Sequence, residues 1–141
     1  MNSSHLYVVH VMDGAMKFGH TSNRKIRWLN YANMAGLAPI SWAFSPRLET
    51  VFNRAEQTML RNARLEFVSD KRGVEWFTTN DFKRASELVE AAFEQYKPWH
   101  SHGGWKRGSM FDESRDGSPV VVDASRLESW AQRLYREGLF A

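Results

Sequence analysis

Residues 6–19 read LYVVHVMDGAMKFG, and this stretch decides the fold. Four of its first six residues are aromatic or β-branched, a composition typical of a strand. The pair Asp13-Gly14 follows and is a strong signal for a tight hairpin, because both residue types tolerate positive φ angles. Residues 15–19 then return as a second strand. The stretch therefore predicts a β-hairpin at the start of the fold.

Periodicity and turn signals predict the elements that follow the hairpin. Pro39 opens a strand, Gly36 ends the helix before it, and Asn80 is a candidate N-cap for the last helix of this part. The predicted elements are a helix over residues 23–34, a strand over 40–44, a helix over 48–64, a short strand over 72–77 and a helix over 81–96.

One residue of the 48–64 helix breaks the apolar pattern of its face. Positions i, i+3, i+7, i+8 and i+11 carry Phe52, Ala55, Met59, Leu60 and Ala63, and position i+4 carries Glu56. The helix therefore directs the Glu56 carboxylate at the body of the domain. Burying an unpaired carboxylate costs free energy, so we expect Glu56 to line a cleft or to form a buried salt bridge with Arg27 or Lys17.

The character of the sequence changes after Pro98, and we divide the chain into a main domain, residues 1–97, and an appendage, residues 98–141. Glycines and mixed charges predict a loop over residues 99–119. A short strand over 120–122 and a helix opened by the capping box at 125–128 follow. The apolar side chains that make this helix a candidate homodimer contact are Trp130, Tyr135 and Phe140.

Composition favours a single soluble domain that binds a polyanion. The 141 residues contain no cysteine, no apolar run long enough to span a membrane and no secretory signal pattern, so we expect a cytoplasmic protein. Net charge is +3, but residues 1–65 carry eight Lys/Arg against three acidic residues (+5), and the remainder carries −2. This asymmetry indicates DNA or RNA as a partner; a solvated basic face is the ordinary alternative.

Several short motifs follow one another along the first two thirds of the chain. They are Leu6-Tyr7-Val8, Lys17-Phe18-Gly19, the run His20-Thr21-Ser22-Asn23 followed by Arg27, then Glu56, and Glu75-Trp76-Phe77. Together with the predicted elements they resemble the GIY-YIG nuclease superfamily over roughly residues 5–96, and Glu75-Trp76-Phe77 resembles a signature of a phage and bacterial subgroup. The order of the motifs matches the family more specifically than any one of them does. The resemblance implies an α+β fold, an α/β sandwich with a small three-stranded antiparallel sheet flanked by helices and followed by a C-terminal strand-helix appendage. Lys17 departs from the tyrosine usual at its position, although that subgroup commonly has lysine there.

The resemblance also implies a metal-dependent endonuclease that hydrolyses DNA, associated with a phage or a mobile element. Glu56 would hold Mg²⁺ or Mn²⁺, and Arg27 would bind the scissile phosphate. Tyr7 would orient the attacking water or accept its proton. Lys17 would act as phosphate ligand or base, and His20 as proton relay or phosphate ligand. The ordinary interpretations are a core aromatic for Tyr7, surface positions for Lys17, Arg27 and His20, and a structural acid for Glu75.

Basic residues outside this group are candidate contacts for nucleic acid. Together with Lys17 and Arg27 they are Arg24, Lys25, Arg54, Lys106 and Arg107. His100 and His102 could share a metal, although no further ligand set is evident. Two other functions stay open: a nucleic-acid-binding module that does not cleave, and a phage-encoded regulator that binds another protein.

Overall fold

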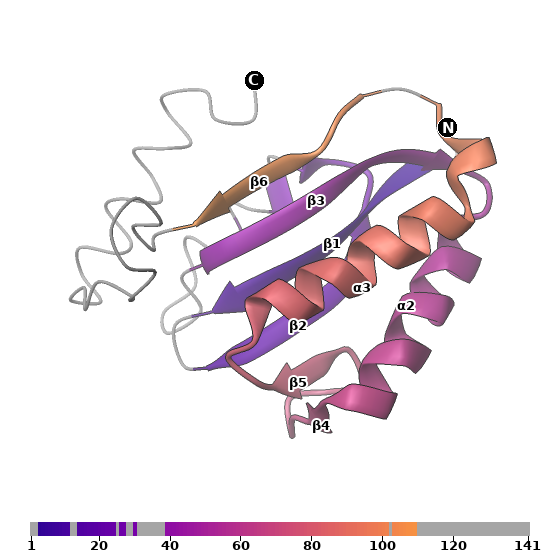
Figure 1. Ribbon diagram of the computed structural model, residues 1–141. Helices are drawn as coiled ribbons and strands as arrows, with labels where there is room; N and C mark the ends of the chain where they lie inside the picture. Colours follow the sequence, from indigo (N-terminus) through magenta and orange to yellow (C-terminus); the bar gives the residue numbers. More distant parts are fainter. Residues whose placement is uncertain are drawn as a thin grey trace.

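The computed structural model describes residues 3–11, 14–24, 26, 27, 30, 39–101 and 103–109. It has an α+β fold, as the sequence predicts, in which two helices lie against an antiparallel sheet (Figure 1). The sheet has six strands in the order β4-β5-β2-β1-β3-β6. The expected three-stranded sheet is therefore too small: β1, β2 and β3 form its centre, and short strands extend it on both sides.

The predicted hairpin is confirmed. Strand β1, Ser3–Val11, pairs antiparallel with β2, Ala15–Thr21, with Val11 opposite Ala15 and His5 opposite Thr21. Gly14 has a φ of 85°, and its amide donates to the Val11 carbonyl. A side chain at this position would be strained, which explains the glycine.

Strand β3, Pro39–Glu49, pairs with the other side of β1 and is longer than predicted. Helix α2, Phe52–Glu66, begins four residues later than predicted, because Leu48 still pairs with Ser4 in the sheet. The chain then turns at Thr50, which has a φ of 41°.

Three short strands complete the sheet. Strand β4, Val68–Ser69, and β5, Trp76–Thr78, extend it beyond β2, whereas β6, Lys106–Ser109, pairs with β3. The prediction of a loop over 99–119 is therefore wrong for residues 106–109. A 3₁₀ turn, η1, Lys97–Trp99, precedes them.

Helix α3, Phe82–Gln95, packs beside α2 on the same face of the sheet (Figure 1). Its N-cap is Asp81, whose side chain accepts from the Arg84 amide, and the prediction of Asn80 as cap is wrong. Asn80 Oδ1 instead lies 3.1 Å from His10 Nε2. The core between helices and sheet is built mainly from Leu6, Val8, Met16, Phe18, Met59, Leu60, Phe77, Leu88, Val89 and Phe93.

Only part of the predicted 23–34 helix is described. Arg24, Ile26, Arg27 and Asn30 are helical, and Asn23 Oδ1 accepts from the Ile26 amide at 3.1 Å, as an N-cap does. The predicted strand at 120–122, the final helix and its dimer contact lie outside the described residues. None of the described helices is long and apolar enough to cross a membrane.

Candidate functional site

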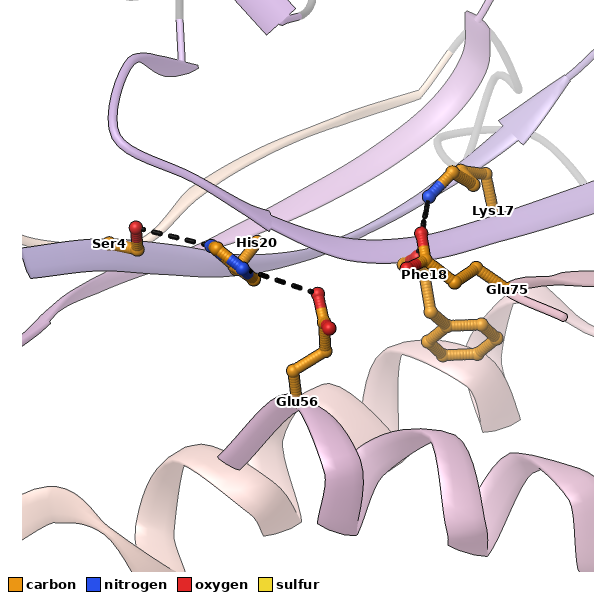
Figure 2. A network of polar contacts seen from close by, with 6 residues as sticks. All are labelled: Ser4, Lys17, Phe18, His20, Glu56 and Glu75. Carbon is orange, nitrogen blue, oxygen red and sulfur yellow. Dashed lines mark hydrogen bonds and ion pairs between the residues drawn. The ribbon is translucent and has the colours of Figure 1, made fainter. Parts of the chain in front are cut away.

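The candidate site lies where the outer edge of β2 passes over the first turns of α2. Strand β5 pairs with β2 only at residues 15–17, so beyond Lys17 this edge has no strand neighbour in the described part of the chain. Figure 2 shows the Glu56 side chain rising from α2 toward His20 on β2. Lys17 lies further along the same strand, and Glu75, which immediately precedes β5, lies beside Lys17.

Glu56 is buried, as its place in the apolar stripe predicts; 8% of the residue is exposed. Burial raises the pKa of its carboxyl group above the usual value, and the negative charge of Glu75 adds to the rise. The Lys17 charge and a hydrogen bond from the His20 main chain oppose it. The folded protein therefore holds a carboxylate whose ionisation is unfavourable.

His20 is the nearest charged or titratable partner of Glu56. The distance from its Nε2 to Glu56 Oε2 is 3.8 Å, and its Nδ1 is hydrogen-bonded to Ser4 Oγ at 3.2 Å (Figure 2). The ring also packs against Phe52, with centroids 4.9 Å apart. Burial lowers the pKa of His20, and Arg27 and Lys17 lower it further against an opposing effect of Glu75. His20 is therefore neutral at neutral pH and gives Glu56 no compensating positive charge.

Lys17 pairs with Glu75 and not with Glu56. Its ammonium group forms a short ion pair with Glu75 Oε2 and donates to the Phe18 carbonyl at 3.1 Å. The buried salt bridge considered for Glu56 is thus not formed by Lys17. No ion pair joins Glu56 to Arg27 among the described contacts, although Arg27 lies close enough for its charge to influence His20.

Tyr7 lies beneath this group rather than in it. The residue is 1% exposed, its ring packs on Phe44 at 5.3 Å, and Lys17 Nζ lies 5.9 Å from the ring centroid. A Cβ atom on Gly19, which pairs with Tyr7 across the hairpin, would stand 2.8 Å from the phenol oxygen. Gly19 therefore makes room for Tyr7, whose side chain is buried.

The other predicted nucleic-acid contacts are spread over the molecule. Arg24 donates to the Gly104 carbonyl at 2.6 Å, and Arg107 pairs with Glu90 at 2.8 Å while stacking on Trp105. Lys106 is half-buried on β6, whereas Arg54 is exposed on α2. Lys25 lies outside the described residues.

The described part of the chain gives no support to a metal site shared by His100 and His102. His100 Nε2 lies 3.2 Å from the Gly103 carbonyl oxygen, and His102 lies outside the described residues. In the part of the chain that the structure describes, no group of three or more His, Asp or Glu side chains could hold a metal ion.

Two members of the site were missed or undervalued in the sequence. Ser4 carried no signal, because its role depends on the pairing that places the start of β1 beside the end of β2. Glu75 was read as a structural acid, yet it pairs with Lys17 and influences the pKa of both Glu56 and His20. The Glu-Trp-Phe motif was the available signal for Glu75.

No family model matches the chain, and no curated protein or solved structure matches it.

Proposed function

We propose that this chain is a nuclease of the GIY-YIG type that hydrolyses phosphodiester bonds of DNA at the Glu56 site. The observation that carries the proposal is the buried Glu56 carboxylate, which faces a neutral histidine at a strand edge and has no cation bonded to it among the described residues. Folded proteins rarely keep such a group without a use for it, because its desolvation costs free energy. The order of the sequence motifs supplies the fold and reaction type.

The residues present fit a divalent metal held by one carboxylate. Mg²⁺ usually keeps several waters and binds proteins through one or two carboxylates, so a three-ligand cluster is not required. Glu56 would be the ligand: its carboxylate is buried, and burial together with the negative charge of Glu75 raises the pKa of the carboxyl group, so a bound cation would offset an unfavourable negative charge. The bound ion would polarise the scissile phosphate and stabilise the leaving oxygen.

The chain's own groups would bind the substrate and move the proton. Arg27 would contact the phosphate, since its guanidinium carries a fixed charge and pairs well with phosphate oxygens. His20, neutral at neutral pH, would take up a proton at Nε2 while Ser4 fixes the orientation of its ring. Lys17 is already paired with Glu75, so its role would be to fix that carboxylate beside the site. Tyr7, being buried, would support Lys17 and Gly19 rather than contact water.

A cleavage assay tests this function. Plasmid and single-stranded DNA are incubated with wild type, Glu56→Gln and Glu90→Gln, each with Mg²⁺, with Mn²⁺ and with chelator. We expect wild type and Glu90→Gln to cut in the presence of metal, and Glu56→Gln to be slower by at least about 100-fold, because a metal ligand is lost. Glu90 is the matched control, an exposed glutamate on α3 that pairs with Arg107.

Three results would redirect the assignment. Cleavage that survives Glu56→Gln unchanged would remove the metal role from this residue. Tight DNA binding without cleavage under any condition would favour the non-catalytic binding module, which the basic first half of the chain also supports. A protein that neither binds nor cuts DNA would leave the regulator of another protein as the remaining reading.

A further inference from the structure

The solvent side of α2 carries a row of polar residues that begins one turn before Glu56. Asn53, Gln57, Arg61 and Arg64 follow one another at intervals of four, four and three residues, and all four are exposed. Side chains at this spacing lie along one side of a helix. Asn53 precedes Glu56 by three residues, so this row, which we call the α2 stripe, starts beside the candidate site and leads away from it.

The arginines of the α2 stripe are uncompensated. Neither Arg61 nor Arg64 forms an ion pair with any described residue, and the same holds for the neighbouring Arg54. Elsewhere on the described surface the cations of Arg84, Lys97 and Arg107 have carboxylate partners, whereas the exposed Lys71 and Lys83 form no ion pair with a described residue. The helix that carries Glu56 therefore presents exposed arginines that are available to an external anion.

The length and chemistry of the stripe fit a nucleic-acid backbone. Eleven residues of helix between Asn53 and Arg64 span about 16 Å. Successive base pairs of DNA rise by about 3.4 Å along the duplex axis, so the stripe is as long as about five base-pair steps. Guanidinium forks donate in pairs to phosphate oxygens, and the two amide side chains supply further donors nearest the site.

We propose that the α2 stripe is the surface along which DNA is bound, with Arg61 and Arg64 contacting phosphates several nucleotides from the bond that is cut. This inference rests on the proposed nuclease function and deepens it, since it states along which surface the bound DNA leads away from Glu56. Glu56 and the stripe belong to one rigid helix. The distance between anchored phosphates and the cut position is therefore fixed by helix geometry.

Binding of a short labelled DNA duplex to the Glu56→Gln protein tests the proposal without cleavage. Three double variants are made in that background: Arg61→Gln/Arg64→Gln, Arg61→Lys/Arg64→Lys, and the control Lys83→Gln/Lys97→Gln. The control removes the same charge from α3 and η1. Affinity is measured between about 50 and 200 mM salt, and each lost phosphate contact should reduce the slope of log affinity against log salt by about 0.9. Unfolding temperatures verify that every variant is folded.

We expect the Arg61→Gln/Arg64→Gln protein to bind at least about tenfold more weakly, with a salt slope lower by about 1.8. The lysine variant should keep most of the slope and the control all of it. Equal losses of DNA affinity in the glutamine variant and the control would overturn the proposed role of the α2 stripe, because net charge alone would then explain binding. Unchanged binding by the glutamine variant, with wild-type cleavage that still depends on Glu56, would overturn the stripe but leave the nuclease. Absence of both binding and cleavage would overturn both.

Discussion

The Glu56 carboxylate of α2 and the glutamates of α3 lie in opposite environments. On α3, the exposed glutamates have cationic partners: Glu90 pairs with Arg107 at 2.8 Å, Glu87 with Arg84 at 3.6 Å and Glu94 with Lys97 at 3.8 Å. On α2, Glu56 is buried, and its nearest titratable neighbour is a histidine that stays neutral. Exposed pairs of the first kind contribute little to stability, whereas a buried carboxylate without a cation costs stability. This difference is the reason why we propose Glu56, and not the α3 glutamates, as the ligand of an external cation.

The strongest test of this difference is to supply the cation. Adding Mn²⁺ or Mg²⁺ should raise the unfolding temperature of wild type, because an ion that binds only the folded state stabilises it, by about 2.7 kcal/mol at a hundred times its dissociation constant. Glu56→Gln should abolish the shift and Glu90→Gln should keep it. The measurement is thermal unfolding across a metal titration at fixed ionic strength. An equal shift in both variants would place the ion elsewhere.

Removing the carboxylate without metal should show its cost directly. The pKa of Glu56 is raised in the folded state, so its ionisation opposes folding as pH rises above the unfolded value of about 4.5. At neutral pH, in the presence of chelator, Glu56→Gln should therefore unfold about 2 °C or more above wild type. The gap should close below pH about 4.5, where the carboxyl group is protonated in both states.

The matched change on α3 should have the opposite sign. Glu90→Gln removes a surface ion pair and should leave the unfolding temperature unchanged or lower it by about 2 °C at most. If the Glu56→Gln protein were less stable than wild type at neutral pH, burial of the Glu56 carboxylate would not be unfavourable, and the contrast with the α3 glutamates would fail.

The smallest expected effect concerns His20, the histidine on β2 that lies beside Glu56. NMR titration should give His20 a pKa below 6.5, chiefly because the ring is partly buried. Glu75→Gln should lower this pKa further by removing a negative charge, and Arg27→Gln should raise it by removing a positive one. As pH falls below about 6.5, His20 is protonated in the unfolded chain before it is protonated in the folded protein. This difference should lower the free energy of unfolding, and His20→Gln should abolish this part of the pH dependence. Shifts of the same sign in both charge variants would show that these residues do not face His20.

Local signals predicted the parts of the fold that depend on nearby residues. The Asp13-Gly14 turn and the β-branched residues before it specify the hairpin, and helical spacing places Glu56 inward. Short strands were missed where pairing depends on distant partners: Lys106–Ser109 is a strand because β3 offers its edge, some sixty residues earlier in the chain. Helix α2 starts later than predicted for the same reason, because Leu48 pairs with Ser4 in the sheet.

The sequence by itself determined that a carboxylate on α2 would face the interior, because 3.6-residue periodicity fixes the direction of Glu56 relative to its apolar neighbours. Only the tertiary structure decided what that carboxylate meets. Lys17, the cation considered as its partner, pairs with Glu75 instead, and Ser4 lies beside His20 through the pairing of β1 with β2. Ion pairs form between side chains that are close in space, and spacing along the chain does not predict which side chains these are. For this reason Glu56 has no cation bonded to it among the described residues.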